Sequence, residues 1–206
     1  VCSSDLKSIH LHAARIDFLG EAFGGMKVFT TIIKAEQEAA YNSLRKGVMD
    51  YDRRHGYRGA ESYLDMKEIK SDQDEAIDEA LLDIPDAGDL IPALILAADG
   101  KQIKAYRKGG EVVTLTGDAM KFAAKMLDDK APPNKRLKRG AIIRLYKDDK
   151  GAWQISQLPE VESAFVAVDP KDGAIRALVG GFDFNRNKFN HVTQAWRQPG
   201  SSFKPF

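Results

Sequence analysis

The hydrophobic pattern of the chain changes its period near residue 90, and this change constrains the fold more than any other feature. Five short runs of alternating or β-branched residues follow it, and turn residues such as Asp99-Gly100 and Gly109-Gly110 separate them. The runs are residues 90–98, 101–107, 111–116, 141–147 and 152–157. Helical spacing predicts one short helix between them, over residues 117–127. Five short strands with one interposed helix predict a small β-barrel of the oligonucleotide/oligosaccharide-binding (OB) type.

Helical and strand patterns flank this region on its N-terminal side. Residues 34–52 carry an apolar residue at every fourth position, which predicts a helix with one apolar stripe. The stripe consists of Ala40, Leu44 and Val48. Residues 26–32 are β-branched and aromatic and predict a strand before that helix. Residues 71–82 predict a second, acidic helix, which Pro85 ends.

A second β pattern follows the barrel region. Residues 161–168 and 174–179 predict a hairpin across a turn rich in Asp, Pro and Gly. Residues 191–197 predict a short helix, and the break at Pro199-Gly200 predicts a new helix that starts at Ser201. The chain therefore mixes helices and short antiparallel strands, and its fold class is α+β.

The charges of the chain are segregated, although their total is close to zero. The chain has 31 Lys and Arg against 30 Asp and Glu, which excludes a uniformly basic nucleic-acid binder and an acidic disordered tail. Residues 61–100 carry 2 basic and 12 acidic side chains, whereas residues 101–150 carry 14 and 6. The simplest interpretation is the solvated faces of one small domain, and two others remain open: one module whose halves attract, or two surfaces with different partners.

Metal and nucleic-acid partners are not expected from the composition. A single cysteine, Cys2, excludes a disulfide framework and a multi-cysteine metal site. The histidines lack the spacing of metal ligands; they are His10, His12, His55 and His191. The basic run 130–144 is a candidate to bind nucleic acid or an anionic glycan, but few aromatic residues interleave it, and stacking platforms need more. The aromatic residues near it are Tyr106, Tyr146 and Trp153.

The pattern S-x-x-K from Ser201 to Lys204 is the candidate for chemistry. Three residues apart on a helix, the two side chains project from one face, so the amine can accept the hydroxyl proton and release a nucleophilic alkoxide. The pattern also begins at Ser4 and at Ser43. Only the copy at Ser201 follows a Pro-Gly break that opens a helix, where free backbone N–H groups favour an oxyanion and disfavour a protonated lysine.

Four blocks of the sequence together resemble one family. Residues 197–206 resemble the active-site segment of penicillin-binding transpeptidases, and residues 167–181 are similar to the hairpin that opens that domain. Residues 28–32 and 51–59 resemble the linker of bifunctional class A penicillin-binding proteins of the 1a type. In that family an OB-like domain lies between the linker and the transpeptidase domain, which matches the predicted barrel.

The resemblance implies a division of the chain into three parts. Residues 1–59 are then a linker, with a strand and a helix, between a glycosyltransferase and a transpeptidase domain. Residues 60–160 are an OB-like domain, and residues 161–206 are the first hairpin and helix start of a β-lactamase-like transpeptidase domain. The chain is then an internal fragment. Residues 1–6 also resemble translated adapter sequence, and we expect them to be artefactual.

The resemblance also implies a reaction and its partners. Ser201 is the acyl nucleophile and Lys204 its base partner, and peptidoglycan stem peptides that end in D-Ala-D-Ala are the substrates. β-Lactams acylate the same serine, and no metal or organic cofactor is implied. The parent protein also polymerises lipid II, lies at the periplasmic face of the bacterial inner membrane through an N-terminal anchor outside this chain, and offers its OB-like domain to a regulatory protein.

The sequence departs from the family pattern in one respect. It contains no S-x-N and no K-[ST]-G element, and it ends two residues after Lys204. We therefore expect the 206-residue piece to be inactive, although its parent is an enzyme. The alternative from another class is a non-enzymatic OB-type barrel that binds a polymer or a regulatory protein. A serine hydrolase of the β-lactamase group is a further alternative, which the linker and barrel before Ser201 disfavour.

Overall fold

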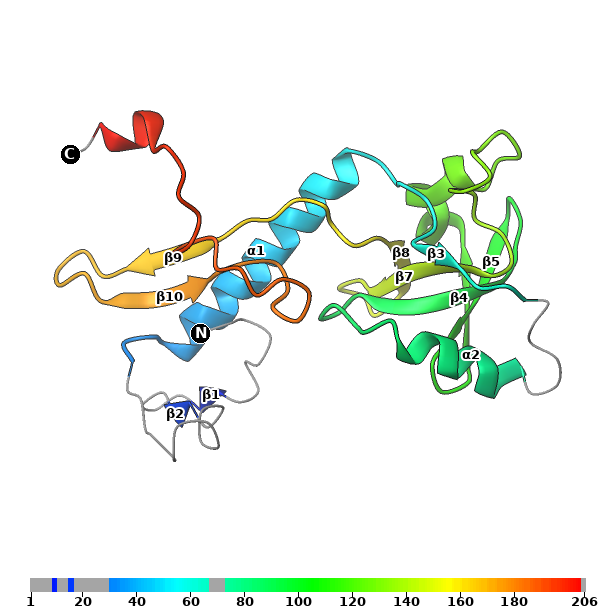
Figure 1. Ribbon diagram of the computed structural model, residues 1–206, viewed down its shortest axis with the longest axis horizontal. Helices are drawn as coiled ribbons and strands as arrows, with labels where there is room; N and C mark the ends of the chain where they lie inside the picture. Colours follow the sequence, from blue (N-terminus) through cyan, green and yellow to red (C-terminus); the bar gives the residue numbers. More distant parts are fainter. Residues whose placement is uncertain (1–8, 11–14, 17–29, 67–72, 205–206) are drawn as a thin grey trace. The chain divides into compact units, whose positions relative to one another are not determined.

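The computed structural model describes residues 9–10, 15–16, 30–66 and 73–204 (Figure 1). The chain divides into two compact units, of which the first combines residues 1–50 with residues 161–206 and the second comprises residues 51–160. Within the described ranges, no helix is both long and apolar enough to cross a bilayer.

The second unit is built around one antiparallel sheet. Its strand order is β3-β7-β4-β5-β6, and β8 pairs with β7. The strands are β3 (Ser62–Tyr63), β4 (Ile91–Ala98), β5 (Gln102–Arg107), β6 (Glu111–Thr116), β7 (Ala141–Lys147) and β8 (Trp153–Ser156). The five strands expected from the change of period are present as β4 to β8. The two-residue strand β3 was not expected from the sequence, because so short a segment has no period of its own.

Two helices complete this unit. Helix α2 (Gln73–Leu82) occupies the described part of the predicted acidic helix, and residues 71–72 lie outside the described residues. The helix expected after the third strand is present as a 3₁₀ helix, η3 (Gly117–Met126). Met120 and Ala123 of η3 are buried and join the barrel core, and η3 packs against β5, β6 and β8.

The central strand β4 is buried on both of its faces. Ala93 and Ile95 point into the main core of the unit, whereas Leu94 packs with Ile77 and Leu81 of α2. A strand covered on both faces shows a nearly continuous apolar run instead of an alternating one, and burying each large side chain contributes about 2 kcal/mol. Figure 1 shows α2 lying along one side of this sheet. This double burial explains the continuous apolar run of β4.

An ion pair between a buried arginine and a partly exposed glutamate joins the acidic and basic halves of the second unit. Arg144 of β7 is only 3% exposed, and its Nε and Nη2 donate to the two carboxylate oxygens of Glu61 at 2.7 and 2.8 Å. Its Nη1 donates to the carbonyl oxygens of Pro85 at 2.7 Å and Leu90 at 3.4 Å. The guanidinium thus binds three separate segments of the acidic half. The structure favours the interpretation of one module whose halves attract.

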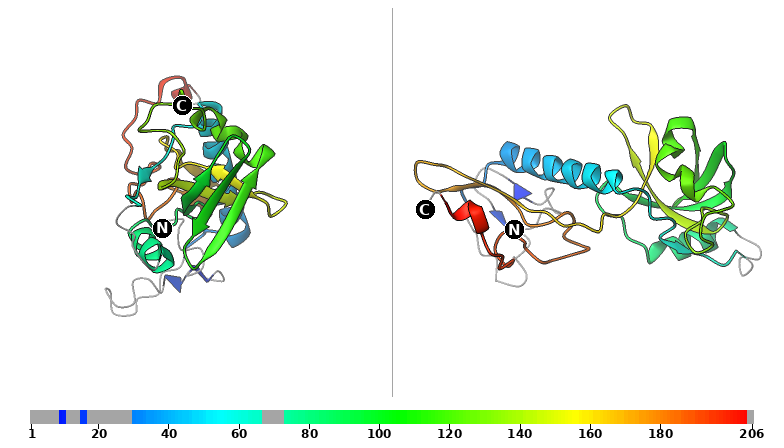
Figure 2. Two further views of the ribbon diagram at one scale, coloured as in Figure 1. Left: turned by 90° about the vertical axis from the view of Figure 1, so that its right-hand side faces the viewer. Right: turned by 90° about the horizontal axis from the view of Figure 1, so that it is seen from above.

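The first unit contains most of a long helix and a β-hairpin. Helix α1 (Lys34–Arg54) begins in this unit and has the apolar stripe that the sequence predicts, since Ala40, Leu44 and Val48 are buried. Strands β9 (Phe165–Val168) and β10 (Ile175–Val179) pair antiparallel, with an irregularity in register after Ile175. Two short strands, β1 (Ile9–His10) and β2 (Arg15–Ile16), form a separate pair. Figure 2 shows α1 beside the β9–β10 hairpin in a second direction of view.

Two local expectations differ from the structure. The helix expected over residues 191–197 is wrong, because residues 191–194 form a turn and residues 195–197 belong to no helix or strand. The amides of Thr193 and Gln194 donate to the carbonyl of Asn190, which closes a single turn that the following residues do not continue. Of the strand expected over residues 26–32, residues 26–29 lie outside the described residues, and residues 30–32 belong to no strand.

We predict that Glu61→Ala destabilises the second unit by about 2 kcal/mol, because it leaves the buried Arg144 guanidinium without its carboxylate. The control is Asp118→Ala, which removes one partner of an exposed ion pair with Lys121 and should leave the stability nearly unchanged, because solvent screens such a pair. Urea unfolding can be followed through Trp153 fluorescence in a Trp196→Phe background. A loss under 1 kcal/mol for Glu61→Ala would show that the carbonyls of Pro85 and Leu90 suffice to hold Arg144.

Candidate functional site

The candidate nucleophile lies in a short 3₁₀ helix, η4 (Gly200–Phe203). Gly200 has a φ of +56°, in the left-handed region that glycine adopts at little cost, so the chain can turn sharply before Ser201. The amide of Ser202 donates to the carbonyl of Pro199 at 3.2 Å, and the amide of Lys204 donates to that of Ser201 at 3.2 Å. In a 3₁₀ turn the side chains at i and i+3 eclipse, so Ser201 and Lys204 project on the same side.

Both candidate side chains are exposed. Ser201, Ser202 and Lys204 all face solvent, and Phe203 is 63% exposed. Among the described residues, no hydrogen bond joins the Ser201 hydroxyl to the Lys204 amine. A lysine must be neutral to accept a proton, and burial is the usual way in which proteins achieve this. The local backbone therefore brings the two groups to one side, and the described residues leave that side open.

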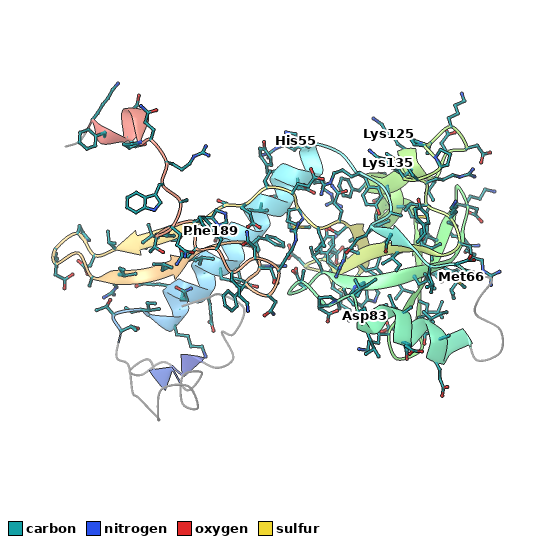
Figure 3. All side chains as sticks on the ribbon, viewed as in Figure 1. His55, Met66, Asp83, Lys125, Lys135 and Phe189 are labelled. Atoms are coloured by element: carbon teal, nitrogen blue, oxygen red, sulfur yellow. The ribbon has the colours of Figure 1, made fainter. Side chains whose placement is uncertain are left out.

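The segment that leads to Ser201 is fixed at its beginning. The carbonyl of Gly180, directly after β10, accepts from both the backbone amide and the Nδ1 of His191, each at 2.8 Å. The ring of Phe189, labelled in Figure 3, stands edge to face with the His191 ring, with 4.9 Å between centroids. Gly180 has no room for a side chain, since a Cβ there would lie 2.8 Å from the Asn190 Oδ1. These contacts close the loop between residues 180 and 191.

A buried polar network occupies the place where the second unit begins and ends. The Asp52 carboxylate, 4% exposed, accepts from Arg58 Nη1 at 2.7 Å and from Gln157 Nε2 at 2.7 Å. The Gln157 Oε1 accepts from the backbone amide of Arg58 at 2.8 Å, and Gln157 Nε2 also donates to the carbonyl of Gly56 at 3.0 Å. The sequence analysis did not detect this network, because its members lie about 100 positions apart.

Neighbouring Tyr57 belongs to the core rather than to a reactive site. Burial raises the pKa of its phenol well above the usual range, and the nearby Glu61 carboxylate raises it further. Its ring packs edge to face on Phe122 at 5.2 Å. The phenol therefore stays neutral at physiological pH and contributes packing.

The aromatic residues close to the basic run are engaged within the unit. Tyr106 is 1% exposed, and its hydroxyl donates to the Asp78 carboxylate at 3.2 Å. The ring of Trp153 has the Arg107 guanidinium at 4.3 Å and the Lys147 amine at 4.9 Å. Cations over an aromatic face are held by its quadrupole. Basic side chains of the protein itself thus cover part of the surface where bases would stack.

The two described histidines outside the short strands bind backbone carbonyls. His55 Nδ1 lies 2.8 Å from the carbonyl oxygen of Tyr51, and His191 Nδ1 bonds Gly180 as described above. His12 lies outside the described residues. Across the ranges that the structure describes, no three His, Cys, Asp or Glu side chains converge as metal ligands would.

The second unit matches a family model. Residues 57–161 match the model described as the penicillin-binding protein OB-like domain. This match confirms the OB-like fold class that five short strands and one helix predict.

Three relatives extend the similarity to most of the chain. Penicillin-binding protein 1A of Neisseria lactamica is 42% identical over 183 residues, which are 88% of this chain and 23% of the relative. Penicillin-binding protein 1A of Escherichia coli K12 is 38% identical over 188 residues, or 88% of this chain and 22% of the relative. The crystal structure of penicillin-binding protein 1A from Haemophilus influenzae superposes with a TM-score of 0.74 at 34% identity, covering 92% of this chain and 28% of that one.

The chain therefore spans about a quarter of the length of the relatives that it matches. The resemblance noted from four sequence blocks is confirmed by these matches. The OB-like domain, the helix before it and the hairpin after it occur together in this chain, and the chain belongs to the penicillin-binding proteins of the 1A type.

Proposed function

We propose that the protein containing this sequence synthesises peptidoglycan and that Ser201 is its acyl-accepting nucleophile in D,D-transpeptidation. The main support is the side-by-side projection of Ser201 and Lys204 from η4, which begins at the left-handed Gly200. Membership in the penicillin-binding family supports the reaction class. No cofactor enters the proposed chemistry.

The proposed reaction has two transfer steps. Lys204, as the neutral amine, accepts the hydroxyl proton of Ser201 while Oγ attacks the carbonyl carbon of the penultimate D-Ala of a stem peptide. The amide bond to the terminal D-Ala breaks, and that D-Ala leaves after its nitrogen takes up a proton. An amine from a neighbouring strand then attacks the ester carbonyl, which forms the cross-link and returns Ser201 to a hydroxyl.

β-Lactams enter the same first step in this proposal. The strained ring amide takes the place of the D-Ala-D-Ala bond, and its opening leaves the acyl group on Ser201. The leaving nitrogen stays attached to the acyl group, so it does not diffuse away from the ester. The adduct is therefore long-lived, and a fluorescent penicillin serves as a probe for the nucleophile.

Lys204 needs an environment in which its amine is neutral. The side that carries Ser201 and Lys204 is open in the described residues, so we propose that a bound peptide and the remainder of a transpeptidase domain cover it. Covering the amine disfavours its charged form, and this is the condition for general-base catalysis near neutral pH.

We extend the proposal to the whole protein on the strength of its relatives. Residues 161–206 would begin the transpeptidase domain, and residues 1–59 would link it to a glycosyltransferase that polymerises lipid II. The protein would act at the periplasmic face of the inner membrane, through an N-terminal anchor. A regulatory protein is the partner that we propose for the OB-like domain, whose end strand β6 has an edge without a hydrogen-bonded neighbour in the described sheet and exposes 50% of Val112.

We predict that Ser201→Ala abolishes covalent labelling by a fluorescent penicillin in the protein encoded by the complete reading frame that contains this sequence. Lys204→Met should lower the acylation rate by about 100-fold or more, since a positioned general base contributes on that order. Ser202→Ala is the matched control, because Ser202 is a neighbouring exposed serine outside the proposed pair. Gel fluorescence after denaturation measures the label. Undiminished labelling of the Ser201→Ala variant would refute the assignment of the nucleophile.

We also predict that the 206-residue chain by itself is not acylated by the same probe. It contains no S-x-N or K-[ST]-G element, and its β9–β10 hairpin exposes Phe165, Val166 and Val168 by 41 to 56%. Apolar faces of this kind belong to sheets that pack against further structure. Circular dichroism provides the control that the chain is folded, and labelling of the folded chain at a stoichiometry near one would contradict the prediction.

A further inference from the structure

Strand β10 is hydrogen-bonded on both of its edges, although its sheet has two strands. Strand β9 occupies one edge. Along the other edge, the Thr31 hydroxyl donates to the carbonyl of Ile175 at 2.7 Å, and the amide of Ile33 donates to the carbonyl of Arg176 at 2.9 Å. The residues before α1 therefore satisfy the edge of β10 without forming a regular strand. An edge whose backbone carbonyls are hydrogen-bonded in this way is held in place.

Gln37 completes this edge from the first turn of α1. Its side chain is 1% exposed, and its carboxamide makes two bonds to one residue of β10. Gln37 Nε2 donates to the carbonyl of Leu178 at 2.8 Å, and Gln37 Oε1 accepts from the amide of Leu178 at 2.7 Å. A carboxamide presents the same donor and acceptor as a peptide group, so Gln37 takes the place of a strand residue opposite Leu178.

Arg45 holds the chain four residues further on. This side chain lies two turns along α1 from Gln37 and is only 7% exposed. Its Nη1 donates to the carbonyl of Phe182 at 2.9 Å, and its guanidinium lies 4.0 Å from the centroid of the buried Phe182 ring. One arginine thus fixes both the backbone and the side chain of Phe182.

The bonds to Leu178 and Phe182 hold the part of the chain at which the segment leading to Ser201 begins. Leu178 and Phe182 lie on either side of Gly180, whose carbonyl accepts both bonds from His191. Helix α1 therefore fixes the chain before and after Gly180, and Gly180 fixes His191, ten positions before Ser201. Each of these contacts lies within the first unit.

We propose that Gln37 and Arg45 are positioning residues for acylation at Ser201, acting through the end of β10 and the loop closed at Gly180. This inference rests on the proposed function of Ser201. The physical reason is geometric: a displacement of about 1 Å at the reacting atom can slow a reaction by up to about 100-fold. Both residues are buried against β10 and Phe182, so we expect them to change the rate of bond formation rather than binding.

The experiment uses the protein from the complete reading frame and four variants. Gln37→Met and Arg45→Met keep most of the side-chain volume and remove the hydrogen bonds. Arg45→Lys keeps a donor and a charge, and Lys46→Met is the matched control, because Lys46 is an exposed residue of the same helix. Stopped-flow measurements with a fluorescent penicillin separate the limiting acylation rate from the dissociation constant of the non-covalent complex. Each variant is measured well below its own Tm.

The expected result is a fall of about tenfold in the limiting acylation rate for Gln37→Met and Arg45→Met, with an unchanged dissociation constant. Arg45→Lys should recover most of the rate, and Lys46→Met should match the unmodified protein. A purely structural role would lower Tm and leave the limiting rate of the folded variant unchanged, and that outcome overturns the proposal. If Arg45→Met does not fold, Gln37→Met decides by the same criterion.

The Ser201→Ala variant separates failure of this inference from failure of the proposed function. Labelling that persists without Ser201 refutes the proposed function. Labelling that depends on Ser201, at an unchanged limiting rate in Gln37→Met, refutes only the positioning role.

Discussion

The second unit depends on a buried carboxylate at the place where it begins and ends. A domain inserted into a chain must have its two ends close together, or the flanking structure could not continue. Here Asp52 binds Arg58 shortly after the start and Gln157 shortly before the end. The guanidinium of Arg58 also donates to the carbonyl of Leu158 and pairs with Glu160. Because the carboxylate is 4% exposed, its partners must be present for it to be buried at acceptable cost.

The same principle explains how the segregated charges are used inside this unit. Arg144 stands on a buried strand, so its charge requires several acceptors, and the acidic half supplies a carboxylate and two carbonyls. Asp78 of the acidic half likewise accepts from the Tyr106 hydroxyl and from the amide of Gly109, in the turn between β5 and β6. Arg144 and Asp78 therefore join the two blocks by buried or partly buried polar contacts within one unit.

Helix α1 has two sets of contacts that differ in their physical character. Toward the first unit it offers a carboxamide and a guanidinium to backbone carbonyls and amides near the end of β10. Such bonds are made to main-chain atoms, so they hold the backbone in place independently of the side chains that the hairpin carries. Toward the second unit, Asp52 supplies a charge to the network described above. A single helix thus contributes polar contacts to the cohesion of both units.

The sequence by itself determined the elements whose signal is local. The change of period predicted strands β4 to β8, the apolar stripe predicted α1, and the Pro-Gly break predicted the turn before Ser201, because each depends on neighbouring residues and on their intrinsic preferences. Four motif blocks sufficed to recognise the family. The candidate pair of Ser201 and Lys204 came from the S-x-x-K spacing together with the Pro-Gly break before it, because the same spacing also begins at Ser4 and at Ser43.

Only the tertiary structure decided the contacts that join distant residues. Strand β3 exists because β7 pairs with it, and the helix expected at residues 191–197 stops after a single turn closed on the Asn190 carbonyl. The bonds from Gln37 to Leu178 and from Arg144 to Glu61 span 141 and 83 positions, and no local pattern indicates such partners. Buried polar groups must find partners, but the fold chooses which ones lie within reach. Local patterns in the sequence thus predicted strands β4 to β8 and the S-x-x-K motif, whereas the fold determined which distant residues hold them in place.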